Sequence, residues 1–195
     1  MAKRNKTVDK VRQLFNAANG SHRISWERAS QQGYNFYLDN QLTQTEKNEL
    51  ESRGMPTFTI NRITPVIEML VFYATASRPR WQAVGREGSD TDIATLFADV
   101  ASYVWEMSNG GALYANAITD ACAKGIGYLM VDVDPDMDHG MGEVVIKQIE
   151  PYDVWVDPKS RDPLFQDASY IIMRKILPRE QFLRLFPDDK RKIKK

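Results

Sequence analysis

The hydrophobic pattern of the chain changes its period once, at Gly125-Ile126-Gly127. Before this point, apolar residues recur at three- and four-residue steps, the spacing of one helix face. After it, apolar and polar residues alternate in short runs, which is typical of strands. The two glycines predict a close packing turn between the two parts. Helices followed by strands and a last helix predict an α+β fold, in which a small, mostly antiparallel β segment follows the helical part.

Six helices are predicted before the change of period. Val8, Val11, Leu14 and Phe15 have helical spacing, and Asn19-Gly20 is a stop signal for the first helix. A later helix begins at a capping box, Thr43-Gln44-Thr45-Glu46, and is expected to stop at Gly54. The remaining expected ranges are 26–38, 43–53, 66–77, 90–108 and 112–124.

Segment 66–77 is apolar nearly all round. It follows Thr64-Pro65, where the threonine is expected to be the N-cap and the proline the first helical residue. Such a helix is expected to be buried between other elements. The β-branched segment 57–61 before it is predicted to be a short strand or a crossing loop, and Arg78-Pro79 is expected to end the helix.

Helices 90–108 and 112–124 are joined by Asn109-Gly110-Gly111, which suits a left-handed stop and a tight turn. We therefore expect the two helices to form an antiparallel helical hairpin. The first of them carries one apolar stripe, made of Ile93, Leu96, Phe97, Val100, Val104 and Met107.

Four strands are predicted after the change of period, at 128–133, 143–149, 153–157 and 170–177. Pro178 is expected to open a short last helix that Pro187 ends. A further short strand is expected at 81–85, followed by a loop at 86–89.

The composition, with 43% apolar and 27% charged residues, excludes a collagenous or wholly disordered chain. Cys122 is the single cysteine, so the chain forms no internal disulfide and a reducing compartment is expected. The most apolar run, 66–76, has about half the roughly 20 residues that a membrane span needs. The basic, polar N-terminus does not resemble a secretory signal. These features predict an intracellular protein without a membrane segment.

A net charge of zero hides a division between the ends and the middle of the chain. Residues 1–12 carry +4 and residues 188–195 carry +3, which leaves −7 between them. Basic ends occur in nucleic-acid-binding arms and in solvated termini. A small DNA-binding module is therefore one alternative, although an acidic body argues against a broad DNA-binding surface. Nearby aromatic side chains would suit either base stacking or packing, and their helical spacing favours packing: Trp26, Tyr34, Phe36 and Tyr37.

The acidic segment 132–143 is the first candidate for chemistry. With Asp134 at the first position of an EF-hand loop, His139 falls at the glycine position and Val145 at the twelfth, so this register fails. A solvated hairpin loop is favoured. The alternative is a metal-dependent hydrolase or nuclease, because alternation would place the carboxylates of 132–136 on one face of a strand. The full cluster is Asp132, Asp134, Asp136, Asp138, His139 and Glu143. We nominate no catalytic, cofactor-binding or metal-ligating residue.

Several short motifs follow one another in a recognisable order. Asn61-Arg62-Ile63 precedes the apolar helix, Arg78-Pro79 follows it, and Gly125-Ile126-Gly127 follows the next two helices. With the later motifs, the order and spacing resemble a bacteriophage portal protein, or head-to-tail connector, of the short-tailed-phage type. The resemblance covers about residues 28–189. The later motifs are Glu150-Pro151-Tyr152-Asp153-Val154-Trp155-Val156-Asp157-Pro158, Asp167-Ala168 and Phe186-Pro187-Asp188.

The resemblance implies a structural protein rather than an enzyme, since ATP hydrolysis belongs to the packaging motor, and it implies no cofactor. Portal subunits form a ring, usually dodecameric, at one capsid vertex. The ring contacts the major capsid protein, docks the terminase during packaging, and later joins tail or adaptor proteins. Double-stranded DNA passes through its channel on packaging and ejection without sequence-specific contacts. The implied location is the virion, after synthesis in the host cytoplasm.

The resemblance is to the N-terminal, outer wing region of a portal subunit. It assigns 1–25 to a basic N-terminal arm and helix, 26–125 to the helical part of the wing, and 126–187 to its β-rich part with the final short helix. Residues 188–195 are a basic tail at the expected truncation point. Two features depart from the family: Asp39-Asn40-Gln41-Leu42 stands where Gly-Gln-Trp is often found, and portal subunits are much longer. We therefore expect this chain to be a fragment of a longer subunit.

Overall fold

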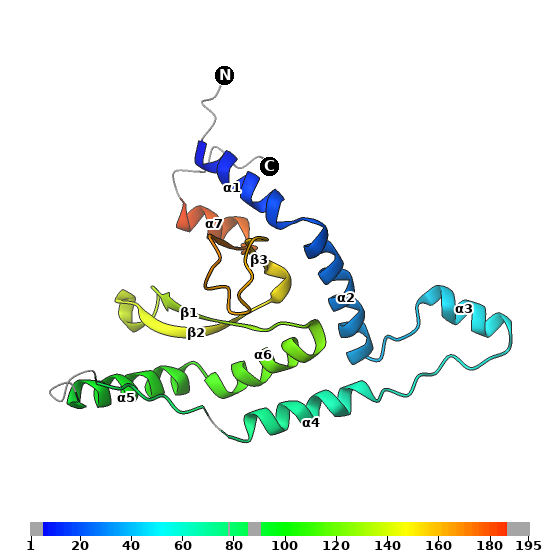
Figure 1. The fold of residues 1–195 in the computed structure, drawn as a ribbon, viewed down its shortest axis with the longest axis horizontal. Helices are drawn as coiled ribbons and strands as arrows, with labels where there is room; N and C mark the ends of the chain where they lie inside the picture. The colour runs from blue at the N-terminus through cyan, green and yellow to red at the C-terminus, as the bar shows by residue number, and fades with distance from the viewer. Residues whose placement is uncertain (1–5, 78, 86–90, 187–195) are drawn as a thin grey trace. The chain divides into compact units, whose positions relative to one another are not determined.

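The computed structural model describes residues 6–77, 79–85 and 91–186, which fall into two compact units (Figure 1). One unit is built from the two ends of the chain, up to Ala18 and from Asp153 onward. The other is the continuous segment Asn19–Tyr152. Seven helices and two small antiparallel sheets among the described residues confirm the predicted α+β class.

The continuous unit is organised around one helix and a β-hairpin. Strands β1 (Tyr128–Asp134) and β2 (Glu143–Ile149) pair antiparallel along their whole length, with Tyr128 opposite Ile149. Helix α6 packs against this hairpin, and α2 and α4 pack against α6. The helices of this unit are α2 (Ser21–Tyr37), α3 (Gln44–Ser52), α4 (Ile63–Thr75), α5 (Thr91–Met107) and α6 (Gly110–Lys124).

Two glycines allow neighbouring backbone to approach α6 closely. A Cβ atom on Gly33 of α2 would lie 2.6 Å from the carbonyl oxygen of Ala123. A Cβ atom on Gly127 would lie 1.9 Å from the carbonyl oxygen of Ala117. Real Cβ atoms do not come this close, so both positions require glycine. The predicted packing turn at Gly125-Ile126-Gly127 is confirmed.

The unit made from the chain ends contains α1 (Lys6–Ala18), β3 (Val154–Val156), β4 (Ile171–Met173) and α7 (Arg179–Leu185). Strands β3 and β4 pair antiparallel. Trp155 of β3 is buried, and its ring centre lies 4.9 Å from that of Phe15 in α1. The hydroxyl of Tyr170 donates a hydrogen bond to the carbonyl oxygen of Leu14 at 3.1 Å. These contacts fasten α1 to the small sheet.

The start of α4 differs from the prediction. The helix begins at Ile63, and the side chain of Asn61 caps it by accepting hydrogen bonds from the amides of Ile63 (2.9 Å) and Thr64 (3.2 Å). The Thr64 hydroxyl, expected to be the cap, instead donates to the carbonyl oxygen of Tyr37. The Thr-Pro signal was misleading because an asparagine three residues earlier reaches the same free amides.

The predicted antiparallel hairpin of α5 and α6 is wrong. Asn109 is left-handed (φ 54°), as expected, but α6 begins directly after it and leads away from the end of α5 (Figure 1). The helix that runs alongside α6 is α4. The Trp105 ring lies against Gly110, where a Cβ atom would be 2.2 Å from it, so glycine at this position lets the ring pack directly against the junction.

The remaining differences concern element boundaries. Helix α2 begins at Ser21, before the expected Trp26, and segment 57–61 is a crossing loop, one of the two expected forms. Segment 81–85 is not a strand, because Trp81 packs its ring against Trp105 and no strand lies beside it among the described residues. The strand expected at 170–177 is shortened to β4.

Several expectations lie outside the described residues. They are the role of Arg78 at the helix end, the loop at 86–89, the helix start at Asp90, the stop at Pro187 and the tail 188–195.

Candidate assembly surface

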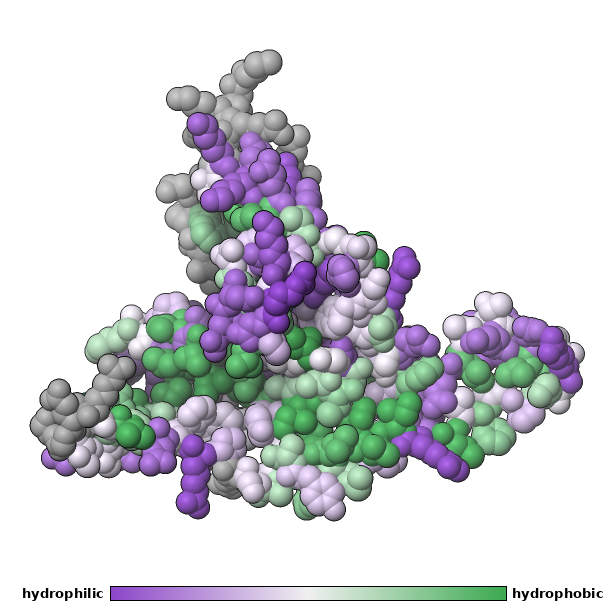
Figure 2. Space-filling model, viewed as in Figure 1, coloured by the Kyte–Doolittle hydropathy of each residue, from purple (hydrophilic) through white to green (hydrophobic). Residues whose placement is uncertain are grey.

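Helix α4 is apolar on nearly every side, but little of it is buried. Ile67 is 7% exposed, whereas Phe72 and Tyr73 are each 67% exposed. The rings of Phe72 and Tyr73 pack edge to face, with centres 5.7 Å apart. The expectation that this helix is buried is therefore wrong for the isolated chain. Figure 2 shows the hydrophobic surface over α4.

The apolar stripe of α5 is uncovered as well. Trp105, near the end of the helix, is buried. Most side chains of the stripe predicted from the sequence are exposed to solvent: Ile93, Leu96, Phe97, Val100 and Met107. Exposed apolar surface of this extent usually marks a site of protein interaction.

A projecting arm connects α2 to α4. It includes α3, which has no buried residue, and its two ends are tied together. The Asn61 side chain donates to the carbonyl oxygens of Phe36 (3.3 Å) and Tyr37 (3.0 Å). The Thr59 hydroxyl donates to Asp39 Oδ1 at 2.7 Å. The base of the arm is thus fixed, while α3 extends away from α6 (Figure 1). The predicted capping box of Thr43 and Glu46 is confirmed.

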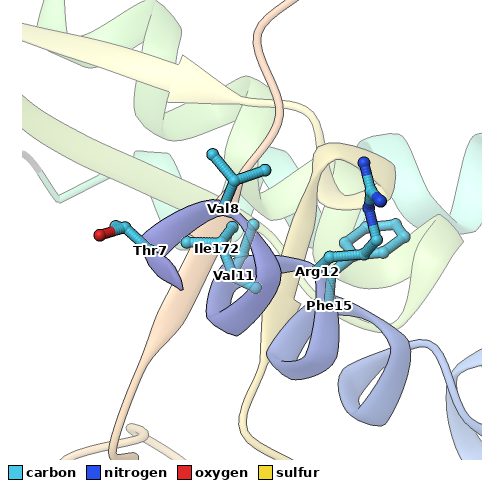
Figure 3. A pocket seen from close by; sticks show the side chains of 6 residues that line it. All are labelled: Thr7, Val8, Val11, Arg12, Phe15 and Ile172. Carbon is cyan, nitrogen blue, oxygen red and sulfur yellow. The ribbon is translucent and has the colours of Figure 1, made fainter. Parts of the chain in front are cut away.

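The unit made from the chain ends has its own uncovered apolar groove, of about 390 Å³, between α1 and β4 (Figure 3). Val8 and Val11 of α1 are exposed along it. No carboxylate, histidine, cysteine or serine is among the described residues that line it. Its lining residues are Thr7, Val8, Val11, Arg12, Phe15 and Ile172.

A buried ion pair lies inside the continuous unit, at the end of α6. The ammonium group of Lys124 lies 2.8 Å from Asp120 and 2.7 Å from Glu150. It also lies over the Tyr34 ring, 4.8 Å from its centre. Burial alone lowers the pKa of Lys124, but the hydrogen bonds and charges of the two carboxylates outweigh it and raise the pKa overall. Lys124 thereby connects α6 to α2 and to the end of β2.

The acidic segment 132–143 comprises the end of β1, the hairpin turn and the first residue of β2. Asp132 and Asp134 share one face of β1 and both approach Lys147, at 3.2 and 3.7 Å. The Asp134 side chain accepts a hydrogen bond from the amide of Asp136, and Asp138 and His139 lie in the turn with positive φ. Nowhere in the described ranges do three His, Cys, Asp or Glu side chains gather closely enough to hold a metal ion. This arrangement supports the loop interpretation.

The aromatic residues of α2 take part in packing. The Trp26 ring lies 5.6 Å from that of Tyr152 and beneath the Arg23 guanidinium group, and Tyr34 stacks on Tyr37. The structure therefore supports packing over base stacking for these residues. Sequence reasoning missed the Asn61 cap and the exposed Phe58 and Ile60, although the Asn-x-x-Thr spacing was a usable signal for the cap.

Uncovered apolar helices, a projecting arm and internally paired polar groups are together typical of a structural protein with surfaces for other proteins. The sequence matches the family model described as phage P22-like portal protein over residues 14–195. The chain belongs to this family, which confirms the resemblance found in the motifs, and its role is that of a structural portal component of a phage. A comparison with curated proteins gives no match. Among the described residues, every helix is too short or too polar to cross a membrane.

Proposed function

We propose that this protein is a subunit of a portal ring at one vertex of the phage capsid. In this role the ring is the channel for genome packaging and ejection and the docking site for terminase and for tail or adaptor proteins. The observation that carries the proposal is the family match over residues 14–195. As part of it, we assign 26–125 and 126–187 to the outer wing, 1–25 to an arm and 188–195 to a tail.

The exposed faces of α4 and α5 support assembly into a ring. Side chains such as Phe72 and Phe97 gain free energy only when another surface covers them. In a cyclic ring each subunit contacts its neighbours through two different surfaces, so uncovered faces on one chain are completed by the next. Charge is compatible with a channel role: a net charge of −7 between residues 12 and 188 disfavours strong binding to DNA phosphates.

The mass of the assembled product of the complete gene tests this function. Native mass spectrometry is expected to show a closed ring whose mass is an integer multiple of the subunit mass. The complete gene is used so that every contact of the full-length subunit is available to the ring. A product that remains monomeric at micromolar concentration contradicts the proposal.

A second experiment separates the ring from the metal-dependent hydrolase. The paired change Asp134→Asn and Asp136→Asn is expected to leave ring assembly unchanged, because both residues lie at the hairpin turn, where the Asp134 carboxylate approaches Lys147 and accepts a hydrogen bond from the Asp136 amide. Neither parent nor variant is expected to cleave DNA with magnesium. Magnesium-dependent cleavage by the parent that the variant loses would favour the hydrolase instead.

A further inference from the structure

One segment of the arm has the sequence of a strand but no strand beside it in the described chain. Thr57, Phe58, Thr59 and Ile60 are residue types that favour strands. Their burial alternates as in a strand: the two threonines are half-buried, whereas Phe58 is 74% and Ile60 68% exposed. Thr59 is hydrogen-bonded to Asp39 on one side. The opposite, apolar side of the segment is uncovered.

The outer edge of β1 is the complementary feature. The sheet has two strands, so β2 covers one edge of β1 and no strand covers the other among the described residues. Leu129, Val131 and Val133 lie on one face of β1 and are exposed, Val131 by 70%. Figure 2 shows hydrophobic surface over this hairpin, separate from that over α4. A seven-residue strand with apolar side chains and no strand beside its outer edge is a template for pairing with another strand, once the Val133 amide exchanges its present bond to Asp132 Oδ1 for a bond to that strand.

Charge complementarity and position indicate a second copy of the chain as the partner. The two charged residues that flank the arm segment are both arginines: Arg53, which forms an exposed ion pair with Glu49, and Arg62. The β1 strand and its turn, residues 128–143, carry five carboxylates and no lysine or arginine. The segment and the β1 edge lie in different regions of the same unit (Figure 1). One chain therefore supplies both halves of a contact that repeats from copy to copy.

We propose that residues Thr57–Ile60 of one subunit add as a third strand to the outer edge of β1 in the next subunit. Phe58 and Ile60 then lie on the same face as Leu129, Val131 and Val133, and main-chain hydrogen bonds complete the edge. Arg53 and Arg62 lie on opposite sides of the segment, so one of them comes near the acidic turn. The inference rests on the proposed ring of identical copies and names the surfaces by which neighbours are joined.

Engineered disulfides test the contact in the product of the complete gene with Cys122→Ser. Phe58→Cys or Ile60→Cys is combined with Leu129→Cys, Val131→Cys or Val133→Cys, because facing side chains in paired strands lie within disulfide reach. Mild oxidation is expected to give a reducible ladder of covalent multimers from at least one of these pairs. Thr57→Cys with the same three partners is the matched control, since it lies on the opposite face and is expected to give no ladder. Single variants report the background.

A charge variant provides a second measurement. Phe58→Asp with Ile60→Asp is expected to weaken assembly about tenfold or more, without changing the far-ultraviolet circular dichroism of the subunit. A ring that forms normally while none of the six disulfide pairs gives a ladder overturns the strand addition and leaves the proposed function intact. Crosslinking of these positions to capsid protein instead of to a second copy also overturns it. Failure of the parent protein to form a ring overturns the proposed function and this contact with it.

Discussion

The side chain of Asn61 donates a hydrogen bond to the main-chain carbonyl oxygen of Tyr37 at 3.0 Å. Asn61 precedes α4 and Tyr37 ends α2, so this bond closes the base of the arm between the two helices. The other side-chain atom of the same amide, Oδ1, caps α4. One asparagine thus fixes both the start of the apolar helix and the direction in which the arm leaves it.

Asn61→Ala is expected to destabilise the subunit by about 2 kcal/mol, because it removes a helix cap and the two hydrogen bonds that Asn61 donates to the carbonyl oxygens of Phe36 and Tyr37. Chemical denaturation followed by circular dichroism measures this change. Asn48→Ala, in the exposed helix α3, is the control and is expected to change stability by less than about 0.5 kcal/mol. Equal effects of the two changes would contradict the role given to Asn61.

Gly127→Ala is expected to destabilise the fold by about 3 kcal/mol, since the new methyl group would collide with the carbonyl oxygen of Ala117 and separate β1 from α6. Gly111→Ala offers a matched comparison. Gly111 lies in α6, and a Cβ atom added there would meet open space. Alanine at this position is expected to stabilise the helix by about 0.5–1 kcal/mol. Thermal unfolding of both variants checks the opposite signs, and a neutral Gly127→Ala would show that the close approach is absent.

Phe72→Ser with Tyr73→Ser is expected to weaken ring assembly about tenfold or more while leaving subunit stability nearly unchanged, because both side chains are mostly exposed in the isolated chain. Mass photometry of the complete-gene product over a concentration series measures assembly. Ile67→Ala on the buried side of the same helix should behave differently and cost about 2–4 kcal/mol of folding free energy. Unaltered assembly of the double variant would show that this face of α4 is not a subunit contact.

Asp157 supplies a prediction for pH dependence. The amide of Lys159 lowers the pKa of this carboxyl group most, burial partly opposes it, and the Ser169 amide lowers it further. A folded-state pKa below the unfolded value of 3.8 means that the stabilisation is complete at pH values above the unfolded pKa. It is lost as the pH falls through the lower, folded value.

The stability difference between the parent and Asp157→Asn, followed by thermal unfolding, is therefore expected to be constant near neutral pH and to shrink below about pH 4. The comparison variant is Asp162→Asn, which changes another carboxylate in the same loop. A difference for Asp157→Asn that does not change with acidity would show that its hydrogen bonds do not depend on ionisation.

Local signals in the sequence predicted much of the secondary structure correctly. The Thr43–Glu46 capping box, the left-handed Asn109 and the packing turn at Gly127 each depend on residues a few positions apart, and all three occur as expected. The β1–β2 hairpin also follows from its alternating pattern. The motif order was sufficient to identify the portal family, because it reflects the whole chain rather than any one site.

Tertiary structure decided which helices lie side by side and which apolar surfaces are covered. Periodicity showed that α4 and α5 are apolar, but it carries no information about the partner that would bury them. Hence α6 packs with α4 rather than folding back on α5, and Phe72 and Phe97 lie exposed. A helix pattern is set by the energetics of neighbouring residues, whereas burial depends on surfaces distant in the sequence or, as proposed here, on another copy of the chain.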